Sequence, residues 1–118
     1  MTWADAGCIV TLSSREEDLF QVAVRRARRS GVSFQPGQVA VWFYRRDSPD
    51  EARGFCRFVE RPIEVYVAVD QTDREVVRTI LHELKHAHDS LRLGTARYRR
   101  IPPTQHEVAA EAFAEAAL

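Results

Sequence analysis

Residues 72–94 constrain the fold most, because their apolar residues and their histidines follow one helical period. Thr72 and Glu75 have the spacing of a capping box, and Gly94 is a typical residue at a helix end. The sequence therefore predicts a helix over about 73–92 with one broad face against a core. The apolar positions of that face are Val76, Val77, Ile80, Leu81 and Leu84.

The same helix carries HELKH, residues 82–86, which matches the pattern H-E-x-x-H. His82 and His86 lie one helical turn apart, so both imidazoles can reach one zinc ion. Glu83 would then lie beside the ion and take a proton from a bound water, whose pKa zinc lowers toward about 7. The alternative is a polar helix face, but all four histidines of the chain lie within residues 82–106.

A catalytic zinc site usually has three protein ligands and one open position, so a third ligand is required. The longer pattern H-E-x-x-H-x-x-G-x-x-H fails, because residues 89 and 92 are aspartate and arginine. The remaining candidates are His88, Asp89, His106, Glu107 and Glu111.

Helix geometry separates one of these candidates from the ion. His88 follows His86 by two residues, about 200° round the helix, and is expected to face away from the metal. Asp89 is expected to be either a hydrogen-bond acceptor for a ligand or a solvated residue at the helix end.

The rest of the chain predicts a small sheet between helices. Residues 63–69 alternate between two faces and are expected to form an edge strand, and TARYRRIPP, residues 95–103, is expected to be a basic loop. The order predicts an α+β domain in which helices cover one face of a three-stranded, mostly antiparallel sheet. The other expected elements are a helix over 13–30, strands over 38–44 and 54–60, and a last helix from Thr104.

The sequence HELKH, followed 21 residues after His86 by Glu107-Val-Ala-Ala-Glu111, resembles the gluzincin zinc metallopeptidases. EVAAEAFAEAAL also resembles the E-x-x-A-x-x-F-A segment of ImmA/IrrE-like and other short gluzincins. The motifs cover residues 79–118, and the order of elements agrees more loosely before them. The resemblance implies one zincin-like domain over 1–118. In that domain His82, His86 and Glu107 hold Zn²⁺, and Glu83 is the general base.

The resemblance also implies roles for two further residues. Glu111 would accept a hydrogen bond from a ligand imidazole, and Tyr98 would donate to the oxyanion of the substrate. Other interpretations remain open for the third ligand and for Tyr98. Thr104 and Glu107 have capping-box spacing, which would turn this glutamate away and leave Glu111 or His106 as the ligand. Tyr98 could simply pack on the basic loop.

Composition and charge bear on partners and compartment. The formal net charge is +0, which argues against nucleic acid and membrane surfaces as partners, and no apolar run is long enough to span a bilayer. No signal peptide is evident, and Cys8 and Cys56 are expected to be free thiols in the cytoplasm.

Two functions are therefore in competition. The first is a zinc-dependent peptidase that binds a peptide or protein substrate along an edge strand, residues 63–69. The second is a catalytically weak or inactive zinc-binding module that acts through a protein partner. A DNA- or protein-binding module that uses the arginines is a third possibility, but it requires a basic balance that this sequence lacks.

Overall fold

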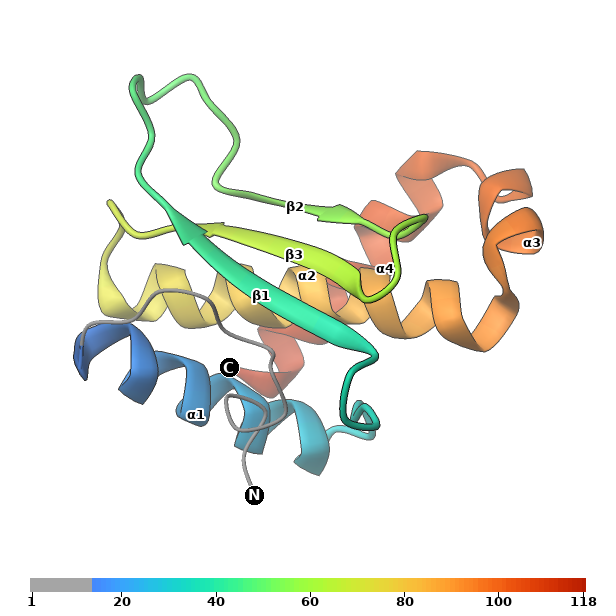
Figure 1. Cartoon of the computed structure of the whole chain (residues 1–118), viewed down its shortest axis with the longest axis horizontal. Helices are drawn as coiled ribbons and strands as arrows, with labels where there is room; N and C mark the ends of the chain where they lie inside the picture. The colour runs from blue at the N-terminus through green and yellow to red at the C-terminus, as the bar shows by residue number, and fades with distance from the viewer. Residues whose placement is uncertain (1–13) are drawn as a thin grey trace.

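Four helices and three strands make up the part of the chain that the computed structural model describes, residues 14–118 (Figure 1). Residue 13 of the first expected helix and Cys8 lie outside this range. The elements are α1 (Ser14–Arg29), β1 (Val39–Tyr44), β2 (Gly54–Arg57), β3 (Ile63–Ala68), α2 (Asp73–Leu93), α3 (Thr95–Arg100) and α4 (Pro103–Ala117).

The sheet has the strand order β1-β3-β2, with β1 parallel and β2 antiparallel to β3. It is therefore a mixed sheet, and the expectation of a mostly antiparallel sheet is wrong for the β1–β3 pair. The loop between β1 and β2 places these two strands apart, and β3 then pairs with both of them from the position between them. The expected edge strand 63–69 is thus the central strand, in keeping with its four buried residues out of six.

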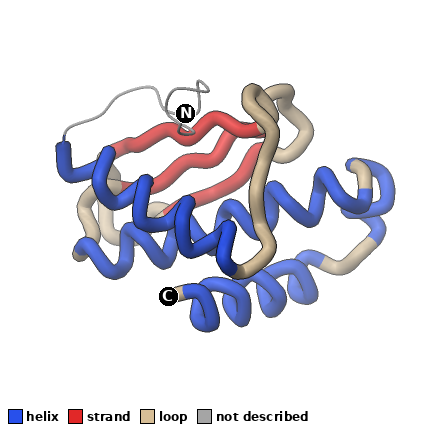
Figure 2. The backbone as a smooth tube through the Cα atoms, turned by 90° about the horizontal axis from the view of Figure 1, so that it is seen from below, coloured by secondary structure: helices blue, strands red, loops and turns tan. Residues whose placement is uncertain are grey.

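All the helices lie on one face of the sheet, as Figure 2 shows, which confirms the predicted α+β class. The core lies between this face and the apolar sides of α1 and α2. In the strands every second side chain points toward the core, and in the helices every third or fourth side chain does so. The largest fully buried side chains include Phe20 from α1, Val41 from β1, Val65 from β3, and Ile80 and Leu84 from α2.

The helix α2 is fixed at both of its ends. The hydroxyl of Thr72 accepts a hydrogen bond from the backbone N–H of Glu75 at 3.2 Å, which confirms the predicted cap. Gly94 ends the helix with φ 85°, a conformation that favours glycine. The guanidinium of Arg15, in α1, donates to Asp73 at 2.8 Å and to the carbonyl of Gln71 at 2.7 Å. The first turn of α2 is thereby tied to α1.

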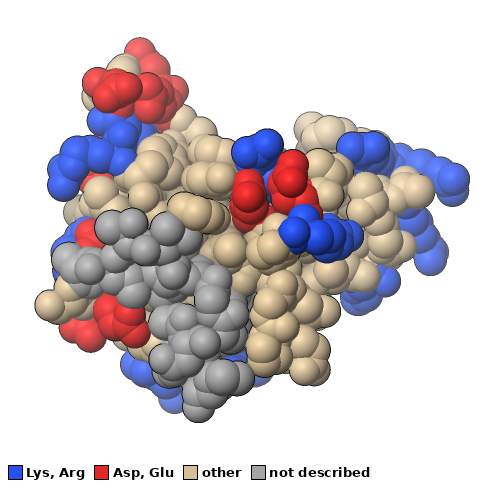
Figure 3. Space-filling model, viewed as in Figure 1, with Lys and Arg blue, Asp and Glu red and all other residues tan. Residues whose placement is uncertain are grey.

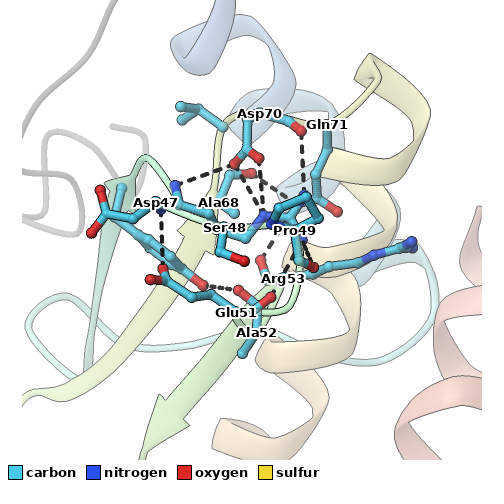
Figure 4. A network of polar contacts seen from close by, with 12 residues as sticks. Asp47, Ser48, Pro49, Glu51, Ala52, Arg53, Ala68, Asp70 and Gln71 are labelled. Atoms are coloured by element: carbon cyan, nitrogen blue, oxygen red, sulfur yellow. Dashed lines mark hydrogen bonds and ion pairs between the residues drawn. The ribbon is translucent and has the colours of Figure 1, made fainter.

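The loop between β1 and β2 is held in the same region by a half-buried arginine. Arg46 donates to the carboxylate of Asp70 at 3.0 Å and to the carbonyls of Pro49 and Glu51 (Figure 4). The hydroxyl of Tyr44 also donates to the carbonyl of Ala52. These bonds fix the loop that leads into β2, and with it the place of that strand.

The region between α2 and α4 differs from the sequence prediction. The expected basic loop contains the short helix α3, and α4 begins one residue before Thr104. Pro102 takes the cap position and Pro103 the first helical position, where the fixed φ of proline suits a helix start. Thr104 therefore lies inside the first turn and makes no capping bond.

Two further findings concern membranes and thiols. No helix within residues 14–118 has the length and apolar character needed to cross a membrane. Cys56 is a free thiol, as predicted.

Truncation of the core should measure how far the fold depends on the contact between α1 and the sheet. Phe20 is fully buried, so Phe20→Ala should lower the free energy of unfolding by about 3–5 kcal/mol in denaturant titrations. Val108 is 71% exposed, and Val108→Ala should change stability by no more than about 0.5 kcal/mol. Equal effects of the two substitutions would contradict this description of the core.

Candidate metal centre

A cavity of about 520 Å³ lies where β2 passes α2 and the first turns of α4. Its lining is formed mainly by β2 with its flanking residues and by the polar side of α2. Along the strand the lining runs from Arg53, just before β2, to Phe58, just after it. The cavity contains the histidines and glutamates that the sequence singled out.

Two helices bring the three predicted ligands together. His82 and His86 come from α2, Glu107 comes from α4, and one ligand atom of each lies within 4.8 Å of the others. The two Nε2 atoms are 3.2 Å apart. The carboxylate of Glu107 places Oε2 at 3.0 Å from Nε2 of His82 and Oε1 at 2.8 Å from Nε2 of His86. This group could hold a metal ion.

The competing interpretations of the third ligand do not agree with the positions of the side chains. Glu107 turns toward the histidines instead of capping α4, because Pro102 already occupies the cap position. His106 is buried, and its Nε2 pairs with the carbonyl of Tyr98 at 2.8 Å, so it lies away from the ligand group. Glu111 contacts Nδ1 of His82, which lies on the other side of the ring from Nε2.

The second nitrogen of each ligand imidazole also has a partner. Nδ1 of His82 lies 2.7 Å from Oε1 of Glu111, as the resemblance implied. Nδ1 of His86 lies 3.1 Å from the hydroxyl of Tyr98. An acceptor at Nδ1 fixes the proton there and leaves the lone pair of Nε2 for a metal. Both rings are thereby oriented for ligation at Nε2.

Burial and the neighbouring His82 lower the pKa of His86, so its ring tends to be neutral. A neutral imidazole is the form that binds metal. Arg78, one turn before His82, donates to Glu111 at 2.8 Å, and this bond lowers the pKa of Glu111. Glu111 therefore remains an anion that can accept the Nδ1 proton of His82.

Glu83 occupies the place expected for a general base. Its carboxylate is buried in the cavity, 4.0 Å from Nε2 of His82. Burial, followed by repulsion from Glu107 and Glu111, raises its pKa to about 8. A carboxylate with a strongly raised pKa in a cavity is typical of functional sites.

A glycine allows Glu83 to lie so close to the sheet. A Cβ atom on Gly54 would lie 2.6 Å from Cγ2 of Thr79, 2.9 Å from the carbonyl of Tyr66 and 3.2 Å from Cγ of Glu83. Every one of these contacts is tighter than side chains ordinarily make. Strand β2 therefore approaches α2 at this point only because residue 54 is glycine.

Tyr98 is held rigidly behind the ligand group. Its ring stacks on His106 with centroids 3.7 Å apart and meets Phe58 at 4.7 Å. Burial raises the pKa of its hydroxyl, which remains protonated. The residue expected to lie in a loop is thus a buried part of α3, where it orients His86.

Two of the sequence candidates lie outside the ligand group. His88 faces away, as predicted, and its half-buried ring meets the edge of Phe34 at 6.2 Å. Asp89 is buried and pairs with Lys85 at 2.9 Å. Asp89 is therefore not a solvated residue. Among residues 14–118, no hydrogen bond joins it to the imidazole of His82 or His86.

Sequence reasoning missed several residues of the cavity. Arg78 lies four residues before His82, so the helical period that selected the histidines could have found it. Gly54 and Phe58 carried no such signal, because their importance arises from tertiary contacts. Cys56 also lines the cavity, and burial followed by Glu83 raises the pKa of its thiol. It is therefore a neutral wall residue.

Comparisons with protein-family models, with curated proteins and with solved structures find no match to this chain.

The close approach at Gly54 yields a test of the site's construction. Gly54→Ala should destabilise the fold by about 1–3 kcal/mol, because the added methyl group overlaps Thr79 and a backbone carbonyl. Thr79→Ser removes the Cγ2 atom and should recover part of that loss in the double variant, with a coupling of at least about 0.5 kcal/mol in denaturant titrations. Strictly additive effects would show that the two residues do not meet.

Proposed function

We propose that the protein is a zinc-dependent peptidase of the gluzincin type. His82, His86 and Glu107 hold the zinc ion, and Glu83 is the general base. The observation that carries this proposal is the convergence of the three ligand side chains beside Glu83 in one cavity. The cavity adjoins an edge of β2 that pairs with no other strand among residues 14–118.

The spacing of the ligand atoms fits a zinc ion. Bonds of about 2.0–2.1 Å in a tetrahedron place neighbouring ligand atoms about 3.3 Å apart. The two Nε2 atoms are 3.2 Å apart, Oε2 of Glu107 lies 3.0 Å from Nε2 of His82, and Oε1 of Glu107 lies 2.8 Å from Nε2 of His86, so the three side chains are close enough to share one ion. Two imidazoles and one carboxylate form a ligand set known from catalytic zinc sites, and they leave a fourth position open.

A zinc ion bound there would polarise the scissile carbonyl and lower the pKa of the attacking water. Glu83 would accept a proton from the attacking water and pass it to the leaving nitrogen, so that one carboxyl group would serve as base and then as acid. The raised pKa of Glu83 shows how strongly its surroundings resist another negative charge. A nearby cation offsets that repulsion and returns Glu83 to the carboxylate form that a base requires.

Tyr98 serves the reaction first by positioning His86. Its hydroxyl oxygen accepts the Nδ1 proton of the imidazole, and its own proton remains to donate to the carbonyl oxygen of the substrate. The stacked ring of His106 and the ring of Phe58 hold this tyrosine in place. A fixed donor stabilises developing negative charge better than a mobile one.

A peptide substrate would lie along β2 and not along residues 63–69, because β3 has partners on both sides. The outer edge of β2 has no strand partner among residues 14–118, and Gly54, Phe55 and Cys56 also line the cavity. An added strand at this edge would place its backbone beside Glu83. The strand and the ligand helix thus face the same substrate.

Metal content and cleavage test the proposal together. Purified protein supplied with zinc should contain about one zinc ion per chain by elemental analysis. His82→Ala should lose the ion, because a ligand is removed, whereas Glu83→Gln should keep it and lose the cleavage of a peptide library. Absence of zinc from the wild type would overturn the proposal. Zinc without cleavage would support the alternative, a metal-binding module.

The contact between Tyr98 and His86 yields a separate prediction. Tyr98→Phe removes the acceptor at Nδ1 and should weaken zinc binding by about 10- to 100-fold in chelator competition. Tyr66→Phe is the matched control, since its hydroxyl bonds to Glu64 outside the cavity. Equal zinc affinities of the two variants would show that Tyr98 does not support the ligand.

A further inference from the structure

The helix α3 carries an excess of positive charge that has no counterpart nearby in the chain. Residues 90–106 contain four arginines and no aspartate or glutamate. Arg92 lies 3.6 Å from Asp89, but Arg97, Arg99 and Arg100 make no ion pair with any residue in 14–118. All three are exposed, and we refer to them as the α3 basic patch.

The charge is distributed unevenly over the molecule as a whole. Figure 3 shows basic side chains without acidic ones at the end where α3 lies, and acidic side chains gathered at the tip of the loop between β1 and β2. The carboxylates of that loop are Asp47, Asp50 and Glu51. Because the net charge of the chain is +0, this is a separation of charge and not a general excess.

The basic patch adjoins the cavity directly. Tyr98, between Arg97 and Arg99, points inward and lines the cavity, while the arginines point out. The guanidinium of Arg99 lies 5.9 Å from the ring centroid of Phe58, a residue of the cavity wall that directly follows β2. A chain that leaves the cavity at the Phe58 end would therefore pass over the patch.

We propose that the α3 basic patch binds an acidic segment of the polypeptide that occupies the cavity. The substrate then carries aspartate or glutamate residues on the side of the cleaved bond that faces α3. A peptide fits better than a nucleic acid, because a polyanion extended along β2 would meet the acidic loop tip at the other end. The proposal rests on the proposed function for the nature of the cavity's occupant.

Binding of labelled peptides tests this assignment. The probes are a blocked peptide with glutamates on one side of a neutral apolar segment, and its glutamine counterpart. With zinc-loaded Glu83→Gln, which cannot consume the probe, the glutamate peptide should bind about tenfold more tightly at low salt, as three exposed charge pairs would give. The preference should shrink as salt rises.

Variants of matched charge decide whether α3 is the site. Replacing Arg97, Arg99 and Arg100 by glutamine should abolish the preference, and replacing all three by lysine should restore most of it. The control changes Arg25, Arg28 and Arg29, three exposed arginines of α1, to glutamine and alters the net charge equally. Equal losses in both triple variants would overturn the proposal, and so would equal binding of the two peptides.

Two further measurements separate this inference from binding of nucleic acid or membranes and from failure of the proposed function. Tighter binding of a single-stranded oligonucleotide or of phosphatidylserine vesicles than of the acidic peptide would overturn it. The wild-type protein is tested beside Glu83→Gln. If the wild type lacks zinc or cleavage yet binds the glutamate peptide through α3, the proposed function fails and the docking surface stands.

Discussion

The structure depends on α2, a single helix that must serve a core on one side and a polar cavity on the other. Leu81 and Leu84 are fully buried, while His82 and His86 turn toward the cavity. The helical period permits both only if the helix can neither rotate nor slide. The bonds from Arg15 and Thr72 at its start, together with the apolar core beneath it, prevent such movement.

The position of Glu107, the proposed third ligand, depends on how closely α4 approaches α2. The buried residues of α4 include Ala110 and Ala114, and side chains this small let two helix backbones come close together. Glu107, one turn before Ala110, thereby reaches 2.8 Å from Nε2 of His86. The alanine-rich composition, which first indicated only a strong helix former, thus has a structural purpose.

Three glutamates share the cavity, and their surroundings separate their properties. Arg78 and His82 engage Glu111, the two imidazoles engage Glu107, and Glu83 has no cation of its own closer than 4.0 Å. Glu83 is also the buried one of the three, and this burial, followed by repulsion from Glu107 and Glu111, raises its pKa. A cation at the ligand group would relieve the repulsion among them, so the charges themselves favour binding of a metal.

The sequence predicted the elements better than their arrangement. Periodicity located α2 and its cap because those signals are local, whereas the central place of β3 depends on pairing with β1 across more than twenty residues. The spacing of Thr104 and Glu107 favoured a capping box, yet the two prolines before them start the helix earlier and free Glu107 for the histidines. The role of Gly54 could not be read from sequence, since the crowding around it comes from α2 and from the backbone of β3.

The short helix α3 joins the chemistry of the site to its surface. In the sequence Arg97-Tyr98-Arg99-Arg100, the tyrosine turns inward to His86 and the arginines turn out to solvent. Stacking between Tyr98 and His106, and the ring of Phe58, fix the orientation of the whole helix. A ligand held by the arginines would therefore bind to the same rigid segment that orients the imidazole of His86, one of the proposed zinc ligands. Docking and ligand geometry would then depend on the same few contacts of α3.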